Sequence, residues 1–144
     1  YVYRVSDFEF NKGIFRLCRY YQDLNYKIFI VTNQSGIARG YYTIEDLIIL
    51  HKWMLSCFKK KKITINKIYF CPHHPKYDLD CNCRKPSPGM ILQAKKEYKL
   101  DLSNSILIGD RNTDLEAGKN AGIKNLVKIR TNDVEDYIEN NLNV

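Results

Sequence analysis

The stretch Cys71-Pro72-His73-His74, followed by Cys81-Asn82-Cys83-Arg84-Lys85-Pro86, brings three cysteines and two histidines together within thirteen residues. Three thiolates and one imidazole are the donors of a closed tetrahedral zinc site. The one-residue gaps are shorter than the zinc-finger spacing of about two to four residues, and buried thiols or disulfides are competing interpretations. The clustering, the prolines and the lysine-rich flanks favour a metal-binding loop.

Two cations follow the last cysteine directly. A bound metal would fix the loop, and the loop would then fix Arg84 and Lys85 in space. An anion that meets pre-organised charge loses less ordering entropy on binding. Without the cysteine cluster, the same two residues would be interpreted as a solvated basic pair.

Composition predicts one globular domain that favours acidic partners. The chain has 144 residues, 44% of them hydrophobic, and a net charge of +7, which suits nucleic acid or a phosphorylated small molecule. It contains no apolar stretch long enough for a membrane span and no signal peptide at its first residues. Cys18 and Cys57 lie outside the cluster, in helical patterns, and this usage predicts a reducing, cytoplasmic setting.

Helical and strand patterns alternate along the chain. Apolar spacing predicts a helix over about 12–24, one from Met90 to Tyr98, and one that runs through Ala121 and ends at Gly122. Another helix is predicted to begin after Thr43, which forms a capping box with Asp46. The tail from Asp133 to Val144 is weakly helical. Short apolar runs predict strands at 27–32, 65–70, 105–108 and 126–129. The expected fold is α/β, with a mostly parallel sheet flanked by helices.

Polar residues gather where these strands end. Ligands of such sheets bind beyond the carboxyl ends of the strands. Thr32 and Ser35 offer hydroxyls for phosphate oxygens, Lys85 offers charge, and Asp110 offers a carboxylate for Mg²⁺. Each residue is ordinary alone, and their joint position predicts a site for phosphate and a divalent metal.

These residues resemble the haloacid dehalogenase (HAD) superfamily of phosphatases. Thr32 matches its second motif, Lys85 its third, and Gly109-Asp110-Arg111-Asn112-Thr113-Asp114 its fourth. More narrowly, the chain resembles the D-glycero-D-manno-heptose 1,7-bisphosphate 7-phosphatases. That resemblance runs from Tyr1 to about Thr131 and rests on Thr32-Asn33-Gln34-Ser35-Gly36-Ile37-Ala38-Arg39-Gly40, Cys71-Pro72-His73-His74-Pro75, Cys81-Asn82-Cys83-Arg84-Lys85-Pro86, Pro88-Gly89-Met90 and Gly109-Asp110.

The resemblance implies a HAD-like, Rossmann-type domain with a zinc-binding loop and no large cap domain. It implies a Mg²⁺-dependent cytoplasmic phosphatase that removes the 7-phosphate of a heptose bisphosphate through a phosphoaspartate, on the route to surface polysaccharide. Implied site residues are Thr32 and Lys85 for the phosphoryl group, Asp110 for Mg²⁺, Cys71, His73, Cys81 and Cys83 for structural zinc, and Tyr1, Asn33, Gln34, Ser35, Arg84 and Arg111 for substrate. The family often has lysine where Arg111 stands; arginine keeps the charge with a different geometry.

The first motif of the family, Asp-x-Asp-Gly-Thr after an apolar strand, is not found among residues 1–144. We therefore expect residues 1–144 to form a single HAD-like domain without its first strand. That strand would lie between those ending at Thr32 and Gly109. Without an upstream segment, we expect poor folding and no phosphatase activity, because the nucleophile would be missing.

Several alternatives share parts of the pattern. Histidinol-phosphate phosphatases share the zinc loop, polynucleotide 3′-phosphatases have a similar second motif, and a non-catalytic, zinc-stabilised phosphosugar-binding domain would need no nucleophile. Ile37-Ala38-Arg39-Gly40 favours the heptose enzymes. The sequence shows no basic groove with interleaved aromatic residues, which argues against nucleic acid as the partner. The expected partner is a phosphorylated sugar, with no membrane and with the chain as a monomer.

Overall fold

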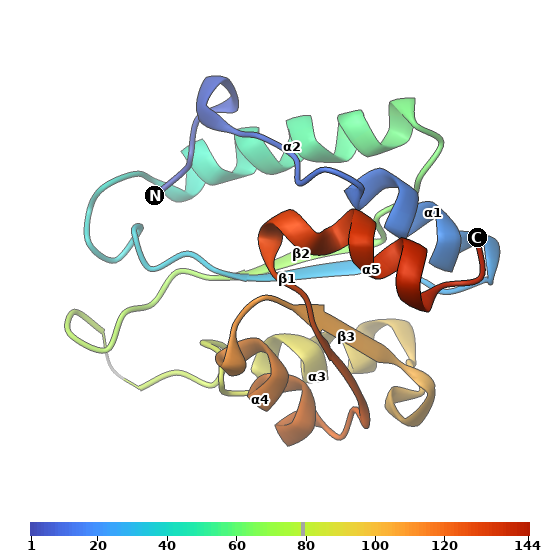
Figure 1. Cartoon of the computed structure of the whole chain (residues 1–144). Coiled ribbons are helices and arrows are strands. Elements are labelled where there is room, and N and C mark those ends of the chain that lie inside the picture. Colours follow the sequence, from blue (N-terminus) through green and yellow to red (C-terminus); the bar gives the residue numbers. More distant parts are fainter. Residues whose placement is uncertain (79) are drawn as a thin grey trace.

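Helices and strands alternate along the chain in the computed structural model, which describes residues 1–78 and 80–144 (Figure 1). The strands are β1 (Phe29–Asn33), β2 (Lys67–Cys71), β3 (Ile106–Gly109) and β4 (Asn125–Lys128). The α-helices are α1 (Ile14–Asp23), α2 (Ile44–Lys60), α3 (Gly89–Tyr98), α4 (Asn112–Ala121) and α5 (Val134–Asn141), with short 3₁₀ turns at Val5–Asp7, Leu102–Asn104 and Thr131–Asp133. The predicted α/β class with parallel strands is confirmed.

The strands form two parallel pairs. β1 pairs with β2, so that Asn33 lies opposite Cys71, and β3 pairs with β4, so that Gly109 lies opposite Lys128. Within the described part of the chain these pairs are separate sheets, and they are divided between β1 and β3, where the sequence analysis expects a strand that residues 1–144 do not contain. Figure 1 shows α2 on one side of the β1–β2 pair and β3, α3 and α4 on the other.

A groove of about 990 Å³ separates the two pairs. All of β3 and β1 from Phe29 to Thr32 line it, together with apolar side chains of α1 and α3 such as Leu17 and Ile91. Among the described residues β1 bonds only to β2, and β3 only to β4, so each has an edge with no strand beside it. Polar groups of strand edges are normally paired or covered.

Local signals in the sequence explain where the elements begin and end. Thr43 and Asp46 form the predicted capping box, with Thr43 N–H donating to Asp46 Oδ2 at 2.9 Å and Asp46 N–H donating to Thr43 Oγ1 at 3.1 Å. Gly122, with a φ of +102°, ends α4 as predicted, because the left-handed conformation suits glycine.

The C-terminal helix packs into the core, a point that the sequence did not decide. Val134 and Ile138 of α5 form a buried cluster with Leu17 of α1 and Ile129, and Ile138 is completely buried. The tail therefore closes one side of the domain. No helix within residues 1–78 and 80–144 is both long and apolar enough to cross a membrane.

Candidate functional site

The loop after β1 carries the predicted hydroxyl and amide groups. Gln34 N–H donates to the Cys71 carbonyl at 2.7 Å, which ties this loop to the end of β2. Gln34 Nε2 donates to Thr32 Oγ1 at 3.0 Å. A Cβ at Gly36 would overlap the Tyr42 ring and crowd Tyr1, so this turn needs glycine to pass beneath the two rings.

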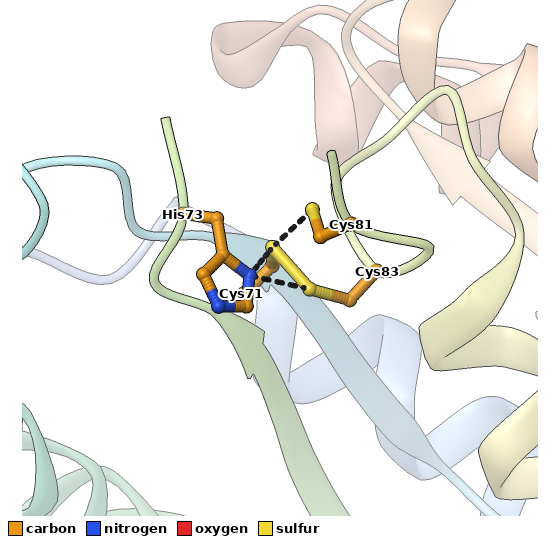
Figure 2. A group of neighbouring side chains, drawn as sticks. All are labelled: Cys71, His73, Cys81 and Cys83. Atoms are coloured by element: carbon orange, nitrogen blue, oxygen red, sulfur yellow. Dashed lines mark hydrogen bonds between the residues drawn. A yellow bond between two sulfur atoms is a disulfide. The ribbon is translucent and has the colours of Figure 1, made fainter. Parts of the chain in front are cut away.

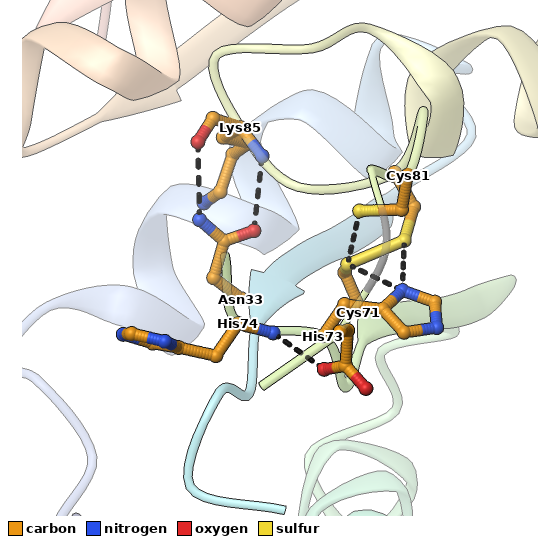
Figure 3. Close-up of a disulfide and its surroundings, with 8 residues drawn as sticks. Asn33, Cys71, His73, His74, Cys81 and Lys85 are labelled. Carbon is orange, nitrogen blue, oxygen red and sulfur yellow. Dashed lines mark hydrogen bonds between the residues drawn. A yellow bond between two sulfur atoms is a disulfide. The ribbon is translucent and has the colours of Figure 1, made fainter. Parts of the chain in front are cut away.

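Asn33 holds the backbone of Lys85. Its Oδ1 accepts from Lys85 N–H at 3.0 Å, and its Nδ2 lies 3.4 Å from the Lys85 carbonyl oxygen (Figure 3). The predicted contact of Asn33 with substrate stays a prediction. What the structure adds is a bond across 52 residues that fixes Lys85 relative to β1.

The side chain of Lys85 points to Asp114 at the start of α4. Lys85 Nζ lies 2.5 Å from Asp114 Oδ1 and 3.3 Å from the carbonyl oxygen of Val31, and both side chains of the ion pair are nearly buried. Burial alone would raise the pKa of Asp114, but the hydrogen bond and charge of Lys85, helped by the Arg111 N–H, outweigh it and hold that pKa below its ordinary value. Asp114 is therefore a charged partner that orients Lys85.

Asp114 is a residue whose role the sequence did not reveal. Its signal was present, since it lies three residues after Arg111, and in the structure its Oδ2 accepts from Arg111 N–H at 3.1 Å. A Cβ on Gly109 would come within 2.5 Å of the Asp114 side chain. Glycine at position 109 thus lets the carboxylate reach back under the end of β3.

Four of these residues line one end of the groove between β1 and β3: Thr32, Lys85, Asp110 and Asp114. Asp110 is exposed, and its Oδ2 lies 3.3 Å from the Thr131 hydroxyl. The end of the groove therefore combines a hydroxyl, a cation and an accessible carboxylate, as predicted for binding phosphate and a divalent metal.

The side chains of Cys71, His73, Cys81 and Cys83 converge at the end of β2, and their four ligand atoms all lie within 4.8 Å of one another (Figure 2). His73 Nδ1 is 3.2 Å from Cys83 Sγ, and Cys81 Sγ is 3.7 Å from Cys71 Sγ. In the structure Cys71 and Cys83 are joined as a disulfide, while Cys81 is free. The predicted cluster is present, and its residues can serve as metal ligands or as a disulfide.

His74 points away from the cysteines (Figure 3). Its Nδ1 accepts from Lys76 N–H at 3.0 Å, and its Nε2 lies 2.8 Å from Nη2 of Arg39, in the loop after β1. Partial burial and the nearby charges of Arg39, Arg84 and Lys76 lower the pKa of His74. His74, which has no role in the sequence-based prediction, thus lies near three cations and near the carboxylate of Asp78, whose Oδ2 accepts from its backbone N–H at 2.8 Å.

The remaining residues predicted to contact substrate lie on the N-terminal segment, the loop after β1, the metal loop and the residue before α4. Tyr1 is two-thirds exposed, and its ring contacts Tyr41 edge-on, with 5.2 Å between centroids. Arg84 follows Cys83 and is partly buried, and Arg111 is exposed at the start of α4. Contacts of Tyr1, Gln34, Ser35, Arg84 and Arg111 with substrate stay predictions.

Replacing Asn33 by alanine is expected to lower the free energy of unfolding by about 1–2 kcal/mol, because two partly buried hydrogen bonds to Lys85 are lost. Urea unfolding followed by the fluorescence of Trp53, which packs on Phe8 and Phe10, measures this. The matched control is Asn120→Ala, which removes one exposed amide bond to Pro86 on the same loop and should cost under about 0.5 kcal/mol. Equal stabilities of the two variants would show that Asn33 does not hold the loop.

Comparison with known proteins agrees with this geometry. A family model described as "HAD-hyrolase-like" matches residues 82–133, the segment with Lys85, Asp110 and Asp114. The D-glycero-alpha-D-manno-heptose-1,7-bisphosphate 7-phosphatase of Campylobacter jejuni is 54% identical over 129 residues, which are 90% of this chain and 73% of that protein. The D-glycero-beta-D-manno-heptose-1,7-bisphosphate 7-phosphatase of Helicobacter pylori strain 26695 is 48% identical over 87% of this chain and 72% of its own length.

A solved structure has a similar fold. The D,D-heptose 1,7-bisphosphate phosphatase of B. bronchiseptica, complexed with magnesium and phosphate, superposes with a TM-score of 0.76 at 29% identity. The match covers 92% of this chain and 73% of that one. The chain thus spans about three quarters of the length of these relatives.

Proposed function

The chain belongs to the heptose-1,7-bisphosphate 7-phosphatase family of HAD-like hydrolases, and from this premise we propose that it releases the 7-phosphate of a heptose 1,7-bisphosphate. The convergence of Thr32, Lys85 and Asp110 at one end of the groove carries the proposal. Relatives named for the alpha and for the beta anomer both match, so the proposal covers the sugar bisphosphate and not one anomer.

Thr32 and Lys85 serve the phosphoryl group. The Thr32 hydroxyl can donate to a phosphate oxygen, and the Lys85 ammonium, held by Asp114 at 2.5 Å, neutralises charge that spreads over the equatorial oxygens. Lys85 is fixed before substrate arrives, through its backbone by Asn33 and through its side chain by Asp114. Pre-oriented charge of this kind stabilises a transition state without reorganisation.

Magnesium fits the accessible carboxylate of Asp110. Mg²⁺ takes one or two carboxylates together with phosphate oxygens and water, and the Asp110 side chain is exposed at the mouth of the groove. When bound, the ion neutralises charge on the transferred phosphate. The magnesium and phosphate of the B. bronchiseptica structure support this choice.

Zinc fits the cysteine and histidine cluster. Zinc–sulfur bonds of about 2.3 Å in a tetrahedron place two sulfurs roughly 3.8 Å apart, and Cys71 Sγ and Cys81 Sγ lie 3.7 Å apart. We propose that the reduced protein holds zinc through Cys71, His73, Cys81 and Cys83, and that the Cys71–Cys83 disulfide is the competing state. The zinc would be structural, because all four positions are filled by the protein.

The groove itself supports a proposal about the nucleophile. It runs between the free edges of β1 and β3, is lined largely by apolar side chains, and ends beside Thr32 and Asp110. We propose that a further parallel strand occupies it in the working enzyme and completes one sheet in a single HAD-like domain. A carboxylate at the end of that strand would reach the phosphate and attack phosphorus while the bond between phosphorus and the sugar oxygen at C7 breaks. The sugar would leave as its alcohol after taking up a proton, and water would then hydrolyse the phosphoaspartate and release phosphate.

The cysteines support a proposal about where in the cell the protein acts. Cys18 and Cys57 are free, and a zinc–thiolate loop needs reduced cysteines; we propose a cytoplasmic monomer acting on a phosphorylated sugar. Burial raises the pKa of the Cys18 thiol to about 11 and keeps it unreactive.

Phosphate release from heptose 1,7-bisphosphate tests the proposal, with protein expressed from the full reading frame. We expect release that needs Mg²⁺ and falls to background with EDTA, and an intact mass above the 17.0 kDa of residues 1–144. A protein of 17.0 kDa that releases phosphate would contradict the additional strand. Mg²⁺-dependent release from histidinol phosphate but not from the heptose bisphosphate would overturn the substrate.

A further inference from the structure

A chain of hydrogen bonds leads from a buried tyrosine to the Thr32 hydroxyl. The Tyr42 hydroxyl donates to Gln34 Oε1 at 2.5 Å, and Gln34 Nε2 donates to Thr32 Oγ1 at 3.0 Å. Thr32 lines the groove, whereas Gln34 and Tyr42 are not among the described residues that line it. Tyr42 is thus connected to the groove through two other side chains.

Packing holds Tyr42 in place. The residue is only 5% exposed, and its ring stacks on the ring of Tyr3 with 5.0 Å between centroids. The turn at Gly36 passes so close that an added Cβ would come within 2.2 Å of the Tyr42 ring. The next residue, Thr43, is the N-cap of α2, which fixes the backbone beside Tyr42. A ring held on all these sides can orient the flexible amide of Gln34.

The direction of the hydrogen bonds follows from the tyrosine. Burial raises the pKa of Tyr42, so its hydroxyl stays protonated and can donate. Within residues 1–78 and 80–144, Gln34 Oε1 is the acceptor that this hydroxyl has, and an amide turned over would face it with an N–H instead. Since buried donors are nearly always paired, the amide places Oε1 toward Tyr42 and Nε2 toward Thr32.

This arrangement leaves the proton of Thr32 available. Accepting from Gln34 uses one lone pair of Oγ1, and the Thr32 O–H can still donate. In the structure that O–H points to the Asn33 carbonyl at 3.4 Å, which is long for a hydroxyl bond. A charged phosphate oxygen in the groove is a stronger acceptor. The bonds from Tyr42 to Thr32 all run toward the groove, so each one polarises the next.

We propose that Tyr42, through Gln34, positions the Thr32 hydroxyl to donate to the phosphoryl group. This rests on the proposed phosphatase function, in which Thr32 serves that group, and extends it to a residue behind the groove. Tyr42 is a positioning residue and does not itself contact substrate. Without the bond from Gln34, the three staggered χ1 positions of Thr32 are no longer distinguished by a partner, which costs up to about threefold in rate. Lost polarisation adds to this cost.

A double-mutant cycle in the full-length protein with Mg²⁺ tests the chain. Tyr42→Phe removes the hydroxyl and keeps the ring, so kcat for heptose 1,7-bisphosphate should fall about three- to tenfold with KM within about twofold. Thr32→Val alone should lower kcat about 10- to 100-fold, because a bond to a charged group is lost. Adding Tyr42→Phe to Thr32→Val should change kcat by less than about twofold, since the hydroxyl to be positioned is gone.

Other variants provide the control and the contrary outcomes. Tyr3→Phe removes a hydroxyl from the ring stacked on Tyr42 and should keep native kcat. Gln34→Leu should behave as Tyr42→Phe does, and it carries the test if Tyr42→Phe fails to fold. Native kcat in folded Tyr42→Phe, or an equal loss in the native and Thr32→Val backgrounds, would overturn the proposal. A loss for Gln34→Leu in both backgrounds would likewise overturn it and would indicate that Gln34 contacts substrate directly.

Binding of inorganic phosphate gives a readout that does not depend on turnover. By calorimetry with Mg²⁺, Tyr42→Phe should bind phosphate about two- to threefold more weakly than native protein, and Thr32→Val should be weakened no further by the second substitution. A protein with this pattern that releases no phosphate from heptose 1,7-bisphosphate would overturn the phosphatase function and keep the positioning role. Release of phosphate with independent effects of Tyr42→Phe and Thr32→Val would overturn only the positioning role.

Discussion

Replacement of Lys85 by alanine is expected to lower kcat for phosphate release by about a hundred- to a thousandfold, with zinc still bound. Lys85 is the nearly buried cation at the end of the groove, and its ammonium is held by Asp114 and by the Val31 carbonyl. In the transition state the charge is spread over the three equatorial oxygens of the phosphoryl group, and a cation fixed in position for that geometry stabilises it more than the bound substrate. The effect should therefore fall on kcat more than on KM.

The same substitution also endangers folding. Asp114 would stay charged and nearly buried without its cation, which costs about 3 kcal/mol in comparable pairs. The double variant Lys85→Ala/Asp114→Asn removes the stranded charge. It should recover most of the lost stability and none of the lost activity, so stability and catalysis are separated by one comparison.

Asp114→Asn alone completes the set. It keeps Lys85 and removes the charge that orients it, so kcat should fall by a smaller factor, about tenfold. Urea unfolding, zinc content and kcat are measured on all three variants. Native kcat in the folded Lys85→Ala protein would show that Lys85 is not the cation that serves the phosphoryl group.

Local patterns in the sequence were sufficient to predict the helices and strands and the places where they begin or end. The capping box at Thr43 and the glycine after α4 depend on a few neighbouring residues, and both were predicted correctly. The convergence of Thr32, Lys85 and Asp110 also followed, because parallel strands bring their carboxyl ends to one edge of the fold.

The missed features depend on contacts between distant segments. The amide of Asn33 bonds to Lys85 across 52 residues, a contact that was not predicted, while its predicted contact with substrate stays a prediction. His74 appeared to be a spare histidine until the fold brought Arg39 to its ring. No local pattern encodes such pairs, because they depend on how the loop after β1 and the metal loop fold against each other.

Strand pairing also lies beyond local patterns, and the strand expected between β1 and β3 came from the family resemblance. Strand patterns show that each segment is extended and buried, but not which strands become neighbours. β1 and β3 each have the pattern of a strand covered on both faces, and they line a groove of about 990 Å³ between two separate pairs. The burial that the sequence pattern predicts for β1 and β3 is therefore greater than the described residues provide.

Replacing Cys81 by serine is expected to reduce bound zinc from about one ion per chain to under a tenth and to abolish phosphate release. Removing one of four ligands opens the site, and the binding energy of a structural zinc is folding energy for its loop. That loop positions Lys85 through Asn33. Loss of zinc should therefore remove activity without touching any residue that contacts phosphate.

Cys81 is the informative position because the two states of the cluster differ there. In the disulfide state Cys71 and Cys83 are joined and Cys81 is free, so serine at position 81 would change little. In the zinc state Cys81 is a ligand. Cys57→Ser, at a free cysteine outside the cluster, and His74→Ala, beside it, are matched controls that should keep zinc measured by elemental analysis. Full activity of Cys81→Ser without bound metal would show that the disulfide alone holds the loop, whereas loss of zinc and activity together, with both controls intact, would establish that the metal fixes Lys85 in place.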